Sequence, residues 1–233
     1  MSGLQYLSRT VLLCRDYVLN GLSDQEISHR FESVQVLCVS DLHNLSSHAG
    51  QVAIITLVSL LSRMGMQVRL SLPDASLLLP QPPLFGSSIS EVLTSSSRKL
   101  TPNATVIQGD NSMADLTFAL GNSKVKNGGV PCWRLSGDDW NGGLSLDREG
   151  EPNSFTCEWP IGSMVSAALA AAEAFKFVMR RMPFRNAPRG FFSTRQPRPG
   201  SNSMRFRFLN KSSILGMSTS SVRGQSLRQP CMC

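Results

Sequence analysis

The first residues that could do chemistry lie in the loop DLHNLSSHAGQ, from Asp41 to Gln51, between a short apolar run and a longer one. If the first run is a strand and the second a helix, this loop lies at the positive end of the helix, where many α/β proteins hold a phosphate. Ser46, Ser47 and the free amides of the first helical turn could therefore bind an anion. However, the loop has a single glycine, Gly50, and the carboxylate of Asp41 would repel a phosphate. These residues predict a poor phosphate site, and a helix-capping role explains Ser47 equally well.

Metal binding is the second chemistry that the sequence suggests. His43 and His48 lie in the same loop, but a bound metal needs further ligands, and the remaining histidine is His29. The six cysteines contain no paired CxxC motif. We therefore predict no zinc site and assign no metal ligand.

Covalent and acid–base catalysis are the third possibility. A cysteine nucleophile needs a lowered pKa and access to its substrate. Cys132 follows Pro131 in an apolar run, so we expect it to be buried, and Cys157 is the other candidate. Asp138 and Asp139 lie at an expected hairpin tip, where adjacent carboxylates do not converge on one proton unless the turn folds them together. We assign them to the turn, and no catalytic residue can be named.

These candidates are positioned by segments that alternate between strand and helix patterns. Val34–Val39 and Gln67–Leu72 are short apolar runs typical of buried parallel strands. Between them, Gln51–Met64 is an apolar helix that ends before Gly65, so the three segments predict a right-handed βαβ unit. The other expected elements are strands at 104–108, 115–120, 131–136 and 143–146, a short helix near 89–93 within the irregular stretch 73–102, and an alanine-rich helix at 163–181.

The two ends of the chain differ from this central part. Residues 1–33 are expected to form an N-terminal helical segment, because apolar residues recur at helical spacing and Ser23 with Glu26 forms a capping-box pattern. Residues 34–182 are then one α/β domain. Residues 183–233 hold nine of the 23 lysine and arginine residues and no aspartate or glutamate. This tail is basic and rich in serine, arginine and proline, so we expect it to be disordered.

The formal charge of +7 therefore belongs to the tail, and the rest of the chain is close to neutral. The tail could attract RNA through counterion release, but its basic residues have no recognisable spacing. No run approaches the roughly 18 uninterrupted apolar residues of a membrane span, and the first residues do not resemble a signal peptide. We expect a soluble, cytoplasmic protein with no membrane partner and, at most, a weak nucleic-acid partner.

The order of the motifs is similar to that of a known family. The segments after the βαβ unit are TPNATVIQG, ADLTFALGN and GGVPCWRLSGDDWNGGL, followed by WPIGSMVSAALAAAEAFKFV, a small-residue helix behind a Pro-Ile-Gly turn. This succession, over residues 34–181, resembles the ThiF-type or E1-like adenylyltransferases, which use ATP to activate the C-terminus of ubiquitin-like or sulfur-carrier proteins. The resemblance implies a Rossmann-like, doubly wound and mainly parallel sheet.

The resemblance also implies where ATP and Mg²⁺ would bind. The role of holding the ribose falls on Asp74, after the second strand, and the metal role falls near Gly121 and Asn122. This second position offers no carboxylate, which Mg²⁺ prefers, and the loop after the first strand lacks the family's glycine-rich turn. The candidate cofactor-binding residues are Asp74, Ser46, Ser47 and Asn122.

Three functions follow as hypotheses. The chain could bind ATP and adenylate the terminal carboxylate of a ubiquitin-like or sulfur-carrier protein, with impaired catalysis. It could instead be a non-catalytic E1-like scaffold, a pseudoenzyme that pairs with an E1-like partner subunit or dimerises through its alanine-rich helix face. The third hypothesis is a nucleic-acid binder that uses the basic tail.

Overall fold

The structure is a computed structural model that describes residues 8–15, 22–79, 84–100, 105–109, 114–125, 129–147, 155, 157–183 and 204–207. The strands are β1 (Gln35–Val39), β2 (Gln67–Ser71), β3 (Val106–Gln108), β4 (Leu116–Leu120), β5 (Cys132–Asp138), β6 (Asn141–Leu146) and β7 (Met204–Arg207). The helices are α1 (Ser8–Arg15), α2 (Asp24–Glu32), α3 (Leu42–Leu45), α4 (His48–Arg63), α5 (Ile89–Leu100) and α6 (Ile161–Met179). The chain is of the α/β class, as predicted.

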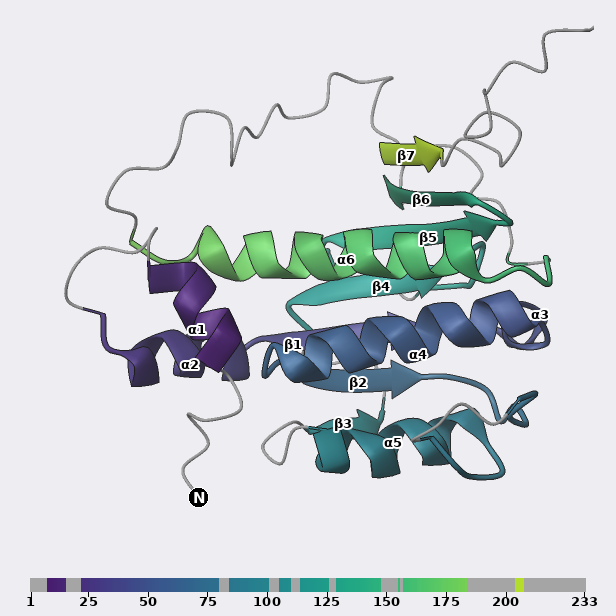
Figure 1. Ribbon diagram of the computed structural model, residues 1–233, viewed down its shortest axis with the longest axis horizontal. Coiled ribbons are helices and arrows are strands. Elements are labelled where there is room, and N and C mark those ends of the chain that lie inside the picture. The colour runs from purple at the N-terminus through teal and green to yellow at the C-terminus, as the bar shows by residue number, and fades with distance from the viewer. Residues whose placement is uncertain are drawn as a thin grey trace, which may run out of the picture.

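The strands form one sheet in the order β3-β2-β1-β4-β5-β6-β7 (Figure 1). Strands β1 to β5 are parallel to one another, whereas β6 and β7 are antiparallel to their neighbours. The chain starts at β1, moves outward through β2 and β3, and then returns to the other side of β1 for β4 and β5. This is the order of a Rossmann-like, doubly wound sheet, so the predicted fold class is confirmed.

The main core lies between the sheet and a layer of helices. In Figure 1, α4 and α6 lie side by side in front of the sheet, and α5 continues this layer beside α4. Leu57 and Leu61 of α4 and Phe118 of β4 are fully buried in this core. Burial of one such side chain contributes about 1.5–3 kcal/mol. Strand β1 is buried on both faces, because Leu37 and Cys38 point to opposite sides and both are inaccessible to solvent.

The alanine-rich helix α6 is used inside the fold. It packs against α4, β5 and β6. Its buried alanines are Ala167, Ala170, Ala171 and Ala174. Ala168 and Ala172, in contrast, are exposed, so a dimer through the alanine-rich helix stays a prediction. By length and composition alone α6 could also span a membrane, but half of its most apolar stretch is buried within the fold, as in a core helix.

The stretch 73–102 differs from its prediction. We expected a short helix near 89–93, but α5 runs from Ile89 to Leu100. The serine run Ser95–Ser97 does not end the helix, because the first and last of these hydroxyls donate to carbonyl oxygens three residues earlier, at 3.2 and 3.0 Å. A buried apolar face also holds α5 against α4.

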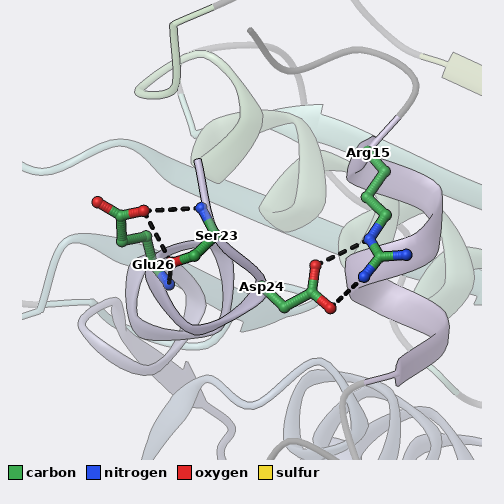
Figure 2. Close-up of polar contacts among 4 residues, drawn as sticks. All are labelled: Arg15, Ser23, Asp24 and Glu26. Atoms are coloured by element: carbon green, nitrogen blue, oxygen red, sulfur yellow. Dashed lines mark hydrogen bonds and ion pairs between the residues drawn. The ribbon is translucent and has the colours of Figure 1, made fainter. Parts of the chain in front are cut away.

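The N-terminal helices are joined to each other by polar contacts and to the body by apolar ones. The capping box is present: Ser23 Oγ accepts from Glu26 N (3.2 Å), and the Glu26 carboxylate accepts from Ser23 N (2.7 Å), as Figure 2 shows. Arg15 of α1 forms a two-point ion pair with Asp24 of α2. Phe31 of α2 is fully buried in the main core.

One edge of the sheet is formed by a strand that the sequence pattern did not predict. Of residues 184–233, the structure describes 204–207, which form β7. This strand pairs antiparallel with β6 and so becomes the last strand of the sheet. The remainder of the expected disordered tail lies outside the described residues.

Candidate functional site

The strand order locates the site to be considered. In a doubly wound sheet, ligands bind outside the carboxyl ends of the strands, where the strand order reverses. Here that point is the crevice between β1 and β4. The crevice is bounded by the loop after β1, residues 40–47, and by the turn after β4, residues 121–123. The phosphate loop considered from the sequence is the first of these two segments.

The loop after β1 does not lead straight into a long helix. It forms the single turn α3, which is capped by Asp41: its Oδ1 accepts the backbone N–H of Asn44 at 2.9 Å. Helix α4 then begins at His48, and Ser47 is its N-cap, with Oγ accepting the N–H of Gly50 at 3.0 Å. The capping role considered for Ser47 is confirmed. Asp41, the expected repulsive charge, is used by the loop itself.

Helix α3 covers the start of α4. Gly50 lies so close to α3 that a Cβ at this position would be 1.9 Å from the backbone oxygen of Asn44, which explains the glycine. Ser46, between the two helices, is exposed, and its hydroxyl donates to the carbonyl of His43 at 2.7 Å. The positive end of α4 is therefore covered by the chain's own backbone instead of being open to an anion.

The side chain of Asn44 fills the crevice and is 1% exposed. Its Nδ2 lies within hydrogen-bonding distance of Asp41 Oδ1 (2.9 Å), the carbonyl oxygen of Leu120 (3.2 Å) and Ser123 Oγ (3.3 Å). Its Oδ1 accepts the backbone N–H of Phe155 at 3.3 Å. Since both polar atoms of this buried amide have partners within the chain, Asn44 locks the loop after β1 to the turn after β4.

The turn after β4 has a shape that fits this amide. Gly121 has a φ of +51°, and a Cβ there would lie 2.8 Å from Asn44 Oδ1. Ser123 Oγ accepts the backbone N–H of Asp41 at 3.0 Å, which adds a second link across the crevice. Arg134 Nη1 donates to the carbonyls of Gly121 and Ser123, both at 2.9 Å. This guanidinium therefore stabilises the turn.

Two open grooves lie beside the locked crevice, at the ends of β1, β2 and β3. The first, of about 510 Å³, is lined by residues 40–42, 70–73, 108 and 109. The second, of about 370 Å³, contains Asp74 and Glu91 and shares Gln108 with the first. Among the lining residues that the structure describes, the charged ones are Asp41, Asp74 and Glu91, without a lysine, arginine or histidine. Hydrogen bonds from Ser87 lower the pKa of Glu91, so it is ionised at neutral pH. These grooves repel a triphosphate.

The four predicted cofactor-binding residues are not brought together in these grooves. Asp74 is exposed and lines the second groove. Ser46, Ser47 and Asn122 line neither groove. Asn122 is exposed in the turn after β4, where the Asn44 network uses the residues on either side of it. The ATP and Mg²⁺ roles implied for these residues stay predictions.

The histidine candidates lie on different parts of the molecule. His43 is exposed on α3, and His29 is exposed on α2. His48 begins α4, and its Nδ1 lies 3.4 Å from the carbonyl oxygen of Glu158. The pair in the loop after β1 therefore shows no arrangement that favours a metal over solvent.

The cysteine candidates are protonated thiols at neutral pH. Cys132 is 4% exposed, and burial raises the pKa of its thiol to about 11. Burial also raises the pKa of the Cys157 thiol, and the nearby carboxylates of Asp139 and Asp138 add to this shift. The predicted burial of Cys132 is confirmed, and neither residue has the lowered pKa that a thioester-forming nucleophile needs.

The tip of the β5–β6 hairpin contains a cluster that sequence reasoning missed. The two strands are joined by Asp139 and Trp140 alone, and Asp139 has a φ of +38°. This turn folds the carboxylates of Asp138 and Asp139 together, so that they and Cys157 Sγ lie within 4.8 Å of one another. The ring of Trp159 lies 5.9 Å from that of Trp140. Asp138 and Asp139 lie at a turn, as expected, and this two-residue turn meets the condition under which adjacent carboxylates come together.

Comparison with known proteins gives both a family and a fold. Residues 34–189 match the family model described as the BilD N-terminal domain. Curated protein sequences give no match. The solved structure of E. coli MccB with MccA is 12% identical, covers 78% of this chain and 66% of its own, and has a TM-score of 0.53. The structure of PaaA is 11% identical, covers 78% of this chain and 77% of its own, and has a TM-score of 0.54.

This chain spans less than two thirds of the length of that MccB chain. At identities of 11–12%, the likeness to MccB and PaaA shows a shared fold and no more. The family model, in contrast, matches well over half of the chain, from the residue before β1 to beyond the end of α6. The protein therefore belongs to the BilD N-terminal domain family.

Proposed function

We propose that this chain is a non-catalytic E1-like domain. It would serve the ATP-dependent activation of the C-terminus of a ubiquitin-like or sulfur-carrier protein by pairing with an E1-like partner subunit. The class of reaction is supported by the shared fold, since structures of MccB include complexes with ATP and with N-formylated MccA. The non-catalytic part is supported by the crevice of this chain.

The Asn44 network is the observation that carries the proposal. A triphosphate lying across the crevice would have to displace Asn44, which would leave the buried N–H of Phe155 without this partner. The Leu120 carbonyl and Ser123 Oγ would lose a contact to Asn44 but would stay bonded to each other, at 2.6 Å. Each buried polar group left unpaired costs about 1–3 kcal/mol. One such group, together with the two lost contacts, lowers the affinity for a nucleotide by roughly 10-fold or more.

The charge around the crevice also lowers the affinity for a nucleotide. Among the described residues that line the adjoining grooves, the charged ones are Asp41, Asp74 and Glu91, and none is basic. ATP carries several negative charges, and enzymes that transfer phosphoryl or adenylyl groups offset such charge with basic residues and metal ions. In this proposal the partner subunit supplies those groups, and this chain supplies a rigid surface for the assembly.

Thermal unfolding of the full chain, with and without about 5 mM ATP and Mg²⁺, tests the proposal. A ligand at 100 times its Kd stabilises the folded state by about 2.7 kcal/mol, which raises Tm by roughly 5–10 °C for a chain of this size. We expect a change of less than about 1 °C. A rise of several degrees that requires Mg²⁺ and disappears in Asp74→Ala, but persists in the control Glu32→Gln, would contradict the proposal and favour an ATP-dependent adenylyltransferase.

A further inference from the structure

The tip of the β5–β6 hairpin carries an exposed group of aromatic and acidic side chains. This hairpin-tip patch consists of Asp138, Asp139, Trp140 and Trp159. The two tryptophan rings are 5.9 Å apart and inclined at 46°, and Trp159 is 51% exposed. Both aspartates are exposed, and the patch lies at the carboxyl end of β5 (Figure 1). Large apolar rings are thus held at the surface beside two negative charges.

The backbone around the patch is tightly fixed. The N–H of Gly162, at the start of α6, donates to the carbonyl of Asp139 at 2.7 Å. The N–H of Asp139 in turn donates to Cys157 Sγ at 3.0 Å. Gly142 of β6 lies so close to α6 that a Cβ there would be 2.4 Å from the carbonyl oxygen of Gly162. Because the patch is held in place before any binding, a partner would lose little affinity to ordering it.

The charge of the patch is not balanced by the described part of the chain. Other aspartates form ion pairs with arginines: Asp24 with Arg15, Asp115 with Arg181, and Asp147 with Arg134. Among the lysine and arginine side chains that the structure describes, which exclude those of β7, none pairs with Asp138 or Asp139. A cation brought by another molecule would relieve the repulsion between these neighbouring carboxylates.

The chain contains an internal example of the contact that would satisfy such a patch. The guanidinium of Arg181 lies 4.1 Å from the centroid of the Phe177 ring and pairs with the carboxylate of Asp115 at 3.1 Å. One arginine therefore stacks on an aromatic ring and pairs with an aspartate at the same time. The hairpin-tip patch offers the same two elements, in a stronger form, because tryptophan is the best aromatic partner for a cation.

We infer that the hairpin-tip patch is a docking site for an arginine side chain presented by a protein partner. The guanidinium plane stacks on the tryptophan rings, and its N–H groups bind the carboxylates of Asp138 and Asp139. Arginine fits better than lysine because its planar group can stack and bind two oxygens together. Tryptophan and arginine are also the residues that most often dominate protein interfaces.

This inference deepens the proposed function by assigning one surface of the domain to its partner. It rests on the partner-binding role proposed above, but separate experiments can contradict the proposed function and this inference. Nucleotide binding is read from the thermal shift with ATP, whereas arginine binding is read from the tryptophan signals with a peptide.

The experiment is a titration of the full chain, isotope-labelled for NMR, with the capped peptide Ac-Ala-Arg-Ala-Arg-Ala-NH₂. The indole N–H signals are assigned with the variants Trp140→Phe and Trp159→Phe. We expect saturable shifts of the Trp140 and Trp159 signals, while the signal of Trp133 is unchanged. The same peptide with citrulline in place of arginine keeps the shape of the side chain but not its charge. Its affinity should be lower by a factor of about 10 or more.

Variants of the two aspartates separate a specific contact from general attraction. Asp138→Asn with Asp139→Asn keeps the side-chain size, and asparagine tolerates the positive φ at position 139; this variant should lose binding of the arginine peptide. The control Glu32→Gln removes a negative charge from α2, at the opposite end of the sheet in Figure 1, and should bind as the parent chain does.

The inference is overturned if the arginine peptide causes no saturable shift, or if the citrulline peptide binds equally well. It is also overturned if the double asparagine variant retains the affinity of the parent chain. If Zn²⁺ alone moves the two indole signals and blocks the peptide, the cluster of Asp138, Asp139 and Cys157 is a metal site instead, and the inference is equally wrong.

Discussion

The crevice between β1 and β4 and the tip of the β5–β6 hairpin both lie at the carboxyl end of the parallel strands. Their polar groups differ in burial and in hydrogen bonding. In the crevice, the amide of Asn44 is buried and bound on both of its polar atoms. At the tip, Asp138 and Asp139 are exposed and unpaired within the described residues, beside the exposed ring of Trp159.

The difference shows how to separate structural polar groups from functional ones in this fold. A polar network that satisfies itself leaves nothing for a ligand to bind, so the crevice that holds ligands in other doubly wound proteins has a structural role here. An exposed and rigid patch, in contrast, keeps its carboxylates in water, where a partner can still reach and bind them. The comparison therefore moves the search for function from the crevice to the hairpin tip.

Removal of the Asn44 side chain should have the largest effect. In Asn44→Ala, the buried N–H of Phe155 loses its partner and the contacts to Leu120 and Ser123 are lost, so we expect the free energy of unfolding to fall by about 2–4 kcal/mol. Urea denaturation measures this. Asn122→Ala is the matched control, because Asn122 is an exposed asparagine in the facing turn, and it should cost less than about 0.5 kcal/mol. Equal losses for the two variants would show that the lock does not exist.

A substitution at Gly50 should disturb the same region through sterics alone. The added Cβ of Gly50→Ala would lie 1.9 Å from the backbone oxygen of Asn44, so α3 must move away from α4. We expect a loss of about 1–3 kcal/mol in urea denaturation. The control is Gly109→Ala, whose Cβ would have Arg69 Nη1 as its nearest neighbour, at an ordinary 3.8 Å. If the two substitutions cost the same, α3 does not pack tightly on α4.

Neutralisation of the hairpin tip should have the smallest effect on stability. Asp138→Asn with Asp139→Asn breaks no ion pair within the described residues, so Tm should change by less than about 2 °C. The pKa of the Cys157 thiol should fall toward its ordinary value, because the carboxylates raise it while burial, the larger cause, persists. The rate of Cys157 alkylation against pH, followed by peptide mass spectrometry, measures this shift. A midpoint that stays in place or rises would show that the carboxylates do not lie near the thiol.

The elements of the sheet could be predicted because their signals are local. The valine-rich run from Val34 to Val39 gives β1, and the capping box from Ser23 to Glu26 spans only four residues. Ser47 was recognised as a cap for the same reason. Helix α5 was underestimated, because a run of serines is a poor predictor of a helix whose stability comes from a buried apolar face.

The site could not be predicted in the same way, since its contacts join distant parts of the chain. Asn44 reaches Leu120, 76 positions away, and Phe155, 111 positions away, and no local pattern encodes these pairs. Asn44 was therefore not predicted as a site residue. Asp138 and Asp139 stand out in the sequence, but their convergence depends on the positive φ of Asp139, which no local pattern encodes.

The most direct test of the account is an NMR titration of the isotope-labelled chain with ATP and Mg²⁺ that follows the side-chain amide of Asn44 and the backbone amides of Asp41 and Phe155. These three groups report on the lock itself. We predict that their signals stay unchanged up to about 5 mM nucleotide, a concentration that would saturate a site of ordinary affinity. Saturable shifts of the three signals together would show that ATP enters the crevice and displaces Asn44, and the account would be wrong.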